Sequence, residues 1–453
     1  MVLKISISGV RGIVDNGLDE RVAFELGASF GTYLHLANKA GVPKVAIARD
    51  TRPSGERLEA PFIDGLIKTG CSVLKFGVVP TPTAQVNVSL QGLSAAVVVS
   101  ASHNPIEWNG FKFIGPRGIF LNEKEANTFL RIYHSKRWTE GIPGNISEDM
   151  QGALVRHMER VFTKLKIAGP MPSLKVALDA VNGAGSVAGP RLLDFMGMES
   201  HLLYCDGSGN FLRGAEPLPE NLNALAELVR NEHCDIGFAQ DPDADRLAIV
   251  DENGVPLGED LTLVLGLEAL IEAKPKGAKT LVVNLSTSMA VDLMAAKHGA
   301  TVVRTPIGEV HVSEGILAHK AFAGGEGNGG LINPDIGMGR DSLGGMATIL
   351  QYLIKNKIKI SQWAAPYRKF KIIKDKVTLD PHIKLEALLG QIKNLVNTGV
   401  LDERDGIKIT WPDRWLHVRA SNTEPIVRIM AESADPIQAQ GLIDQARAVF
   451  SKI

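Results

Sequence analysis

The sequence predicts an α/β protein of three similar domains with mixed, largely parallel sheets, followed by a smaller C-terminal α+β domain. Three times along the chain a short apolar run ends in Asp, Asn or Ser, and a helical segment and two further apolar runs follow it. Such alternation of strands and helices is typical of α/β layers with parallel strand pairing. The length of 453 residues also exceeds a single core, because domains usually contain roughly 100–150 residues.

The elements of the three repeats follow one another in the same order. First strands are expected at residues 45–50, 176–179 and 281–286. Second strands are expected at residues 72–76, 201–204 and 301–304. The third apolar run of each repeat ends in a polar loop with glycine or proline, at residues 100–105, 241–246 and 324–330. The third copy is the weakest, because its last run, 321–323, is short, but each repeat would deliver one loop to a common centre.

The segment after about residue 367 has a different period. Alternating polar and apolar residues predict half-exposed strands, and a final helix closes the chain. These elements are expected at residues 369–374, 406–410, 416–419 and 436–450, with a turn at 411–415. We therefore expect four domains, at residues 1–150, 151–254, 255–366 and 367–453.

Composition excludes several classes of partner. Lys and Arg total 49 against 50 for Asp and Glu, a formal net charge of -1, which argues against a nucleic-acid or anionic-membrane partner. The cysteines Cys71, Cys205 and Cys234 lack metal-ligand spacing and fit reduced thiols. The N-terminus is too short in apolar length for a signal peptide, and no run reaches the roughly 18 apolar residues of a membrane span. We expect a globular, cytoplasmic protein.

The loop after the apolar run 95–99 reads Ser-Ala-Ser-His-Asn-Pro and contains the first candidate catalytic residues. Ser102 would lie at the carboxyl end of a strand, where open α/β sheets place their ligands. A hydroxyl close to His103 and to Lys112, expected in the same loop region, suggests transfer of a group onto or off Ser102. Taken alone, the segment is equally compatible with an ordinary polar turn.

The second loop, 241–246, places Asp241, Asp243 and Asp245 at alternate positions. Three carboxylates on one tight loop are tolerable only with a hard cation, and Mg²⁺ suits them if substrate or phosphoserine oxygens complete its coordination. An EF-hand is improbable, because its sixth position would be Arg246 instead of glycine and both flanks resemble strands. The remaining alternative is a solvated turn.

Two further segments carry arginines beside small polar residues. Residues 419–425 read Arg-Ala-Ser-Asn-Thr-Glu-Pro, and Arg428 follows. Hydroxyls, amides and exposed N–H groups between two arginines form an anion cradle, since guanidinium can grip phosphate bidentately. Near the N-terminus, Arg11 lies on an expected glycine-flanked turn. Alone, the cradle is compatible with an ordinary turn and Arg11 with a surface charge.

Together these segments resemble the α-D-phosphohexomutase family, with its motifs in order along the whole chain. The resemblance implies four domains around a central cleft, a phosphorylated Ser102, and Mg²⁺ held by that phosphoserine and the three aspartates. It implies that Glu326 and Asn328 contact sugar hydroxyls and that Arg11, Lys112 and Arg246 lie near the transferring phosphoryl group. The non-reacting phosphate would be bound by Arg419, Ser421, Asn422 and Thr423.

At one position of the third loop this sequence has a different residue from many relatives. Gly330 stands where a histidine could assist proton transfer, so Lys112 and His103 become the candidates for that role. The Glu-Gly-Asn-Gly-Gly form of this loop resembles a subgroup assigned as phosphoglucosamine mutases. Phosphoglucomutase and phosphomannomutase activities remain the alternatives.

The resemblance implies a defined reaction. Phosphoserine 102 would donate its phosphoryl group to O1 or O6 of a hexose phosphate, and the bisphosphorylated sugar would turn in the cleft before returning its other phosphate. The expected partners are thus hexose phosphate and bisphosphorylated hexose, with no nucleic acid or membrane, and the protein would be a monomer or homodimer. A serine phosphatase and a non-catalytic sugar-phosphate sensor are the other classes open, and release of inorganic phosphate would distinguish the first.

Overall fold

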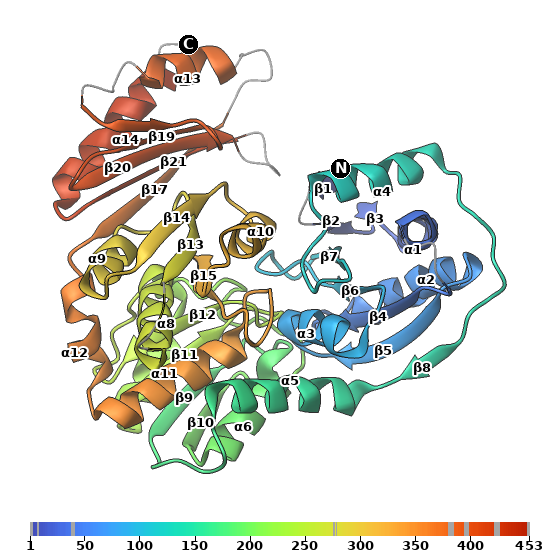
Figure 1. Cartoon of the computed structure of the whole chain (residues 1–453), viewed down its shortest axis with the longest axis horizontal. Coiled ribbons are helices and arrows are strands. Elements are labelled where there is room, and N and C mark those ends of the chain that lie inside the picture. Colours follow the sequence, from blue (N-terminus) through green and yellow to red (C-terminus); the bar gives the residue numbers. More distant parts are fainter. Residues whose placement is uncertain are drawn as a thin grey trace.

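The computed structural model describes residues 3–6, 9–37, 41–274, 277, 279–378, 385–393, 398–420 and 426–450. Its strands form four sheets, of which three are mixed and mostly parallel and the C-terminal one is antiparallel. The predicted fold class is therefore confirmed. Figure 1 shows the C-terminal sheet above the third one, with the first domain to the side of both.

The first sheet is built around the parallel strands β4 (Lys44–Arg49), β5 (Ser72–Val78) and β6 (Ala95–Val99), with β7 (Trp108–Ile114) antiparallel to β6. All five side chains of β6 are buried, as expected of an uninterrupted apolar run in a sheet covered on both faces. The remaining strands lie at the two edges of this sheet: β1 (Lys4–Ser6), β2 (Gly9–Val14), β3 (Gly17–Leu18) and β8 (Ile146–Glu148).

The second and third sheets repeat this central arrangement. In each, the second strand lies beside the first, the first beside the third, and a fourth strand returns antiparallel to the third. The second sheet contains β9 (Lys175–Asp179), β10 (Glu199–Leu203), β11 (Ile236–Gln240) and β12 (Leu247–Asp251). The third contains β13 (Thr280–Asn284), β14 (Thr301–Thr305), β15 (Ala323–Glu326) and β16 (Gly330–Ile332). All three polar loops predicted from sequence thus join the third strand of a sheet to its fourth.

Helices cover these sheets, and their burial follows their composition. Helix α8 (Glu259–Ala273) has apolar residues around its whole circumference and is almost entirely buried, together with the acidic Glu259 and Glu268. The others of the first three domains are α1 (Glu20–Ala37), α2 (Gly55–Lys68), α3 (Thr81–Gln91), α4 (Glu123–Ser135), α5 (Met150–Leu165), α6 (Gly185–Met196), α7 (Asn223–Asn231), α9 (Ala290–Lys297), α10 (Glu309–His319), α11 (Ser342–Asn356) and α12 (Ile360–Ala364), with short 3₁₀ helices η1 (Pro219–Asn221) and η2 (Ala365–Tyr367). None of the helices in the described parts of the chain is long and apolar enough to cross a membrane.

The C-terminal domain has its own sheet and its own apolar core. Helix α14 spans Pro436–Phe450, as predicted, and buries one face against the sheet. The strand expected from residue 416 begins earlier, because the turn closes where the Trp411 N–H donates to the Arg414 carbonyl at 2.9 Å. The sheet order is β17 (Lys371–Thr378), β21 (Ile426–Ser433), β20 (Arg414–Ala420), β19 (Ile407–Thr410) and β18 (Val400–Asp402), and α13 spans Leu385–Lys393.

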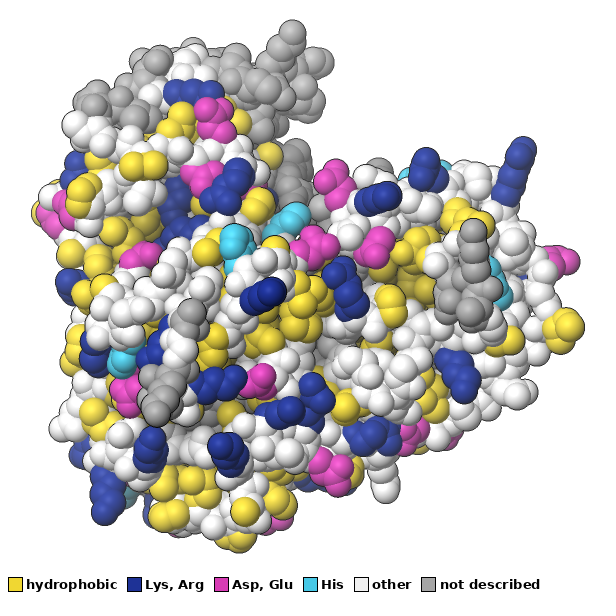
Figure 2. All heavy atoms as spheres, viewed as in Figure 1, with side chains coloured by type: hydrophobic (Ala, Val, Ile, Leu, Met, Phe, Trp, Pro, Cys, Tyr) yellow, Lys and Arg dark blue, Asp and Glu magenta, His cyan; other side chains and the backbone are white. Residues whose placement is uncertain are grey.

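The domains differ in how they are joined. The second and third domains share one apolar core, whereas the first and the C-terminal domain have cores of their own. Polar contacts join the C-terminal domain to the third, including a hydrogen bond of 2.8 Å between His417 Nδ1 and Ser286 Oγ and one of 2.9 Å from the Ile307 N–H to Asp405 Oδ2. In Figure 2 the surface is notched between the C-terminal domain and the first domain.

Three sequence-based placements were wrong. In the third predicted loop, 324–330, residues 324–326 belong to β15 and Gly330 begins β16, so the connection is only 327–329. Lys112 lies on β7 and Arg11 lies on β2, so both belong to strands instead of loops. Strand β2 pairs with β7, with Arg11 opposite Gly110. The polar and glycine residues around both positions suggested turns, but strand pairing inside the sheet overrides such local preferences.

Candidate active site

Ser102 lies in the connection between β6 and β7 and is almost completely buried. Its backbone has a φ of 52°, in the left-handed region that non-glycine residues rarely adopt. Its N–H donates to Ser100 Oγ at 2.9 Å, and its own Oγ donates to Asp241 Oδ2 at 3.2 Å. The turn therefore directs the hydroxyl of the first loop at a carboxylate of the second.

Arg52, which sequence reasoning missed, holds this turn in place. The guanidinium is fully buried and donates four hydrogen bonds of 2.6–2.9 Å to backbone carbonyls of the loop, those of Ser102, Asn104, Pro105 and Trp108. Its Nε donates to Asp50 Oδ2 at 3.1 Å, and the same oxygen accepts a hydrogen bond from Ser100 Oγ. The Arg52 side chain thus donates hydrogen bonds to four backbone carbonyls of this segment, as backbone groups removed from water require.

We expect Arg52→Lys to destabilise the protein and to lower its activity, even though the charge is kept. One ammonium cannot reach four carbonyls, and each buried acceptor left unpaired costs about 1–3 kcal/mol. Urea unfolding should therefore show a loss of roughly 3 kcal/mol. Arg57→Lys on the exposed face of α2 is the matched control, and an equal effect of the two substitutions would contradict this account.

The aspartates of the second loop form a buried triad. Asp241, Asp243 and Asp245 have no exposed surface, and one carboxylate oxygen of each lies within 4.8 Å of the others. Asp243 Oδ1 and Asp245 Oδ1 are buried and have no hydrogen-bond partner among the residues that the structure describes. Unpaired buried carboxylate oxygens are costly unless a cation binds them. Together with Asp241 Oδ2, they offer the hard oxygen ligands that suit Mg²⁺.

The electrostatics of the triad also favour a cation. Burial, and then the neighbouring Asp245 and Asp243 carboxylates, raise the pKa of Asp241 well above its usual value. Burial opposes ionisation of Asp245 too, but Arg340 and Lys112 outweigh it and lower the pKa of Asp245. One carboxylate of the triad therefore lacks a sufficient positive neighbour, and a divalent ion would supply it.

Lys112 and His103 have opposite electrostatic surroundings. Lys112 Nζ contacts Asp243 Oδ2 and lies 3.1 Å from Asp245 Oδ2. Burial lowers the pKa of Lys112, but the two aspartates outweigh burial and raise it. Arg246, burial and Arg11 lower the pKa of His103 well below its usual value. Lys112 is thus held as a cation and His103 as a neutral imidazole.

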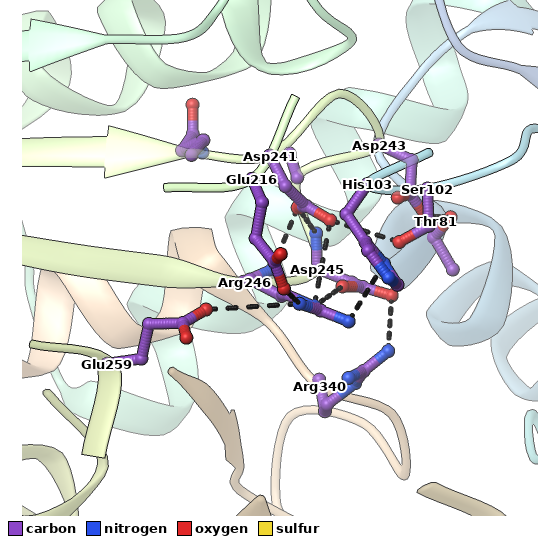
Figure 3. Close-up of polar contacts among 12 residues, drawn as sticks. Thr81, Ser102, His103, Glu216, Asp241, Asp243, Asp245, Arg246, Glu259 and Arg340 are labelled. Carbon is purple, nitrogen blue, oxygen red and sulfur yellow. Dashed lines mark hydrogen bonds and ion pairs between the residues drawn. The ribbon is translucent and has the colours of Figure 1, made fainter. Parts of the chain in front are cut away.

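Two arginines flank the triad with donors to spare. Arg246 Nη1 donates to Glu216 Oε1 at 2.8 Å and Nη2 lies 3.0 Å from His103 Nδ1. Arg11 Nη1 donates to Asn104 Oδ1 at 3.1 Å, and burial lowers the pKa of Arg11 to about 10. The Nε atoms of both arginines are buried without a hydrogen-bond partner. These donors are suited to an anion such as a phosphoryl group. Figure 3 shows Arg246 among these partners.

The third loop brings Glu326 toward the other two. Its Oε1 accepts hydrogen bonds from Asn284 Nδ2 at 2.9 Å and from the Gly308 N–H at 3.0 Å, and Oε2 accepts one from Arg340 Nη1 at 3.1 Å. Asn328 Oδ1 is buried without a partner. The loop therefore holds one fixed carboxylate and one amide oxygen with unused hydrogen-bonding capacity.

Arg340 is the second residue that sequence reasoning missed. It lies between β16 and α11, and its Nη2 donates to Asp245 Oδ2 at 2.7 Å while Nη1 reaches Glu326. Figure 3 shows the guanidinium approaching Asp245 on the side away from Ser102. No sequence motif identifies Arg340. The only local pattern here belongs to the next residue, Asp341, whose side chain caps α11 by accepting a hydrogen bond from the Leu343 N–H.

The predicted anion cradle lies in the C-terminal domain. Arg419 on β20 and Arg428 on β21 are opposite each other in the antiparallel pair. Arg419 Nε donates to Asp405 Oδ1 at 2.9 Å, within the same domain. Ser421, Asn422 and Thr423 lie outside the described residues. The structure thus joins the first three loops directly, and it carries Arg419 and Arg428 on a separate sheet.

Comparison with known proteins identifies the class that this fold and site belong to. Four consecutive domains of phosphoglucomutase/phosphomannomutase match the chain: the α/β/α domains I, II and III at residues 3–140, 155–254 and 258–370, and the C-terminal domain at 375–449. The chain belongs to the phosphoglucomutase/phosphomannomutase family. It is therefore an enzyme of the phosphohexomutase class, isomerases that transfer phosphate intramolecularly.

Individual relatives match over nearly their whole length. The chain is 34% identical to a phosphoglucomutase/phosphomannomutase of Thermococcus kodakarensis, covering 96% of each protein. It is also 34% identical to a probable phosphoglucosamine mutase of Methanopyrus kandleri, covering 97% of this chain and 95% of that protein. A crystal structure of a phosphoglucomutase/phosphomannomutase family protein from Burkholderia thailandensis superposes with a TM-score of 0.84 at 25% identity, covering 99% of this chain and 98% of that one.

Proposed function

We propose that the protein interconverts the 1-phosphate and 6-phosphate of a hexose through a phosphorylated Ser102, with glucosamine phosphate as the sugar. The observation that carries this proposal is the Ser102 hydroxyl 3.2 Å from Asp241, beside the unpaired buried oxygens of Asp243 and Asp245. A serine beside a cation site and buried arginine donors has the groups that phosphoryl transfer needs, which are alignment and charge neutralisation.

In the proposed reaction the bond from phosphorus to Ser102 Oγ breaks and a bond to the free O1 or O6 of the hexose phosphate forms. Asp241, Asp243 and Asp245 would hold Mg²⁺, which would neutralise charge on the transferring group. Arg11 and Arg246 are proposed to offer that group their Nε donors, which make no hydrogen bond within the described residues; Arg246 Nε also lies 4.0 Å from Asp241 Oδ2 and from Asp245 Oδ1. The sugar hydroxyl loses a proton, which the neutral imidazole of His103 is proposed to accept. The cationic Lys112 is proposed to supply the proton that the departing Ser102 Oγ takes up.

The other end of the substrate is assigned to the third and fourth domains. Glu326 and the unpaired Asn328 Oδ1 are proposed to bind sugar hydroxyls. The distal phosphate is proposed to bind in the C-terminal domain, at Arg419, Ser421, Asn422, Thr423 and Arg428. After transfer, the bisphosphorylated sugar would turn over and return its second phosphate to Ser102 Oγ, which restores the phosphoserine. Binding groups on separate domains would accept the sugar in both orientations.

A comparison of three substrates tests the proposal. The enzyme should be assayed with glucosamine, glucose and mannose 1-phosphates, each with the matching bisphosphate as activator and with Mg²⁺ present. We expect the highest kcat/KM for glucosamine 1-phosphate, by about tenfold or more. A preference for glucose or mannose would assign the phosphoglucomutase/phosphomannomutase activity instead. Stoichiometric release of inorganic phosphate without isomerisation would reject mutase activity altogether.

A further inference from the structure

Arg340 contacts three carboxylates that come from different parts of the chain. Beside its bonds to Asp245 and Glu326, its Nε donates to Glu309 Oε2 at 2.8 Å, and Glu309 is the first residue of α10. Each of the three nitrogens of the guanidinium therefore has its own partner. Burial of the whole group makes these charge-assisted bonds strong and their geometry restrictive.

These partners connect all of the first three domains. The other oxygen of Glu309 accepts a hydrogen bond from Gln85 Nε2 at 2.7 Å, and Gln85 lies on α3 of the first domain. Asp245 belongs to the second domain and Glu326 to the third. Because Arg340 binds Asp245 through Oδ2, the unpaired Oδ1 of the same carboxylate remains for a cation.

The path of the Arg340 side chain explains the glycine at position 330. A Cβ atom on Gly330 would lie 2.1 Å from Arg340 Cδ and 2.7 Å from Cγ, far inside van der Waals contact. The next atom, Asn328 Oδ1 at 3.0 Å, also belongs to a side chain, so the backbone does not forbid a larger residue here. The Arg340 stem cannot move aside while three carboxylates hold its end. Glycine at 330 and arginine at 340 therefore depend on each other.

We infer that Arg340 is a positioning residue that fixes the sugar-binding carboxylate Glu326 relative to the cation-binding carboxylate Asp245, and that Gly330 is glycine to admit it. This inference rests on the proposed function of those two carboxylates. The planar guanidinium sets the separation and angle between its partners, which a single ammonium cannot do. Transfer between a phosphoryl group held at one carboxylate and a sugar held at the other depends on that geometry.

The first test removes the side chain and then restores its end group from solution. We expect Arg340→Ala to lower kcat about 100-fold, with a smaller change in KM, because a misplacement near 1 Å costs that much. Millimolar guanidinium chloride, which can enter the vacated space, should recover at least a tenth of the lost rate, whereas methylammonium should not. Arg160→Ala is the control, since Arg160 donates to the Ile336 carbonyl of the same segment and, within the described part of the chain, pairs with no carboxylate.

The second test is a double-mutant cycle with Gly330→Ala. This substitution should lower kcat tenfold or more in the presence of Arg340 and less than twofold in the Arg340→Ala background, because the clash is with that side chain alone. Equal effects in both backgrounds, or a folded Arg340→Ala enzyme that guanidinium fails to rescue, would overturn the inference.

If Arg340→Ala does not fold, a third variant tests whether Arg340 positions the two carboxylates. Arg340→Lys keeps the charge and most of the stem, and should still lose about 100-fold in kcat because one ammonium cannot hold both carboxylates. A normal rate for Arg340→Lys would overturn the inference. Absence of mutase activity in the unmodified enzyme would instead reject the proposed function, so the two failures are distinguishable.

Discussion

Ser102→Ala should abolish mutase activity, lowering kcat by about 10⁴-fold or more, while leaving the fold intact. The hydroxyl is the atom proposed to form the covalent intermediate, and the methyl group of alanine cannot act as a nucleophile. The methyl group of alanine fits the same space and gives up only the 3.2 Å hydrogen bond to Asp241. Steady-state assay with glucosamine 1-phosphate and its bisphosphate measures the effect.

Intact-mass spectrometry provides the matching chemical readout. The unmodified protein incubated with bisphosphorylated sugar should gain one phosphate, and Ser102→Ala should gain none. Ser89→Ala on α3 is the control and should retain both the adduct and the rate. Turnover of Ser102→Ala within tenfold of the unmodified rate would show that the phosphoryl group is carried elsewhere.

Removal of the cation, or of any aspartate proposed to hold it, should have the second largest effect. We expect chelator to stop turnover and Mg²⁺ to restore it, and we expect Asn at 241, 243 or 245 to lower kcat about 100-fold or more and to raise the Mg²⁺ concentration needed. Activity titrated against Mg²⁺ measures both changes. Full activity in chelator would contradict the assignment of the triad.

The stability of the cation-free protein separates two of these aspartates. Burial, and then the neighbouring Asp245 and Asp243 carboxylates, raise the pKa of Asp241 and so oppose its ionisation; Asp241→Asn should therefore raise the unfolding midpoint in chelator. Asp245 pairs with both Lys112 and Arg340, so Asp245→Asn should cost roughly 3 kcal/mol by removing one carboxylate partner from each of two buried cations. Asp64→Asn on the exposed face of α2 is the control, and shifts of the same sign in both site variants would contradict this account.

The sequence alone determined the repeat and the place of its three loops. Runs such as 95–99 are apolar because both faces of the sheet are covered, and the change to small polar residues marks where the strand ends. The pattern of apolar runs is therefore sufficient to place the Ser102, Asp241 and Asn328 loops near corresponding strand ends. The folded chain adds that each loop connects to an antiparallel fourth strand, which is the reason that the loops are tight.

Only the tertiary structure revealed Arg52 and Arg340, and it moved Lys112 from a loop to a strand. Local sequence patterns indicate which positions are buried and which backbone conformation they adopt. Most partners of Arg52 and Arg340, however, lie far away in sequence. Arg340 binds a carboxylate 95 residues away, and Arg52 binds carbonyls 50 to 56 residues away. Such pairs are fixed by how sheets and domains pack, and no short motif encodes that packing. The reactive groups could thus be read from single loops, while the cations that orient them became visible only when the loops were brought together.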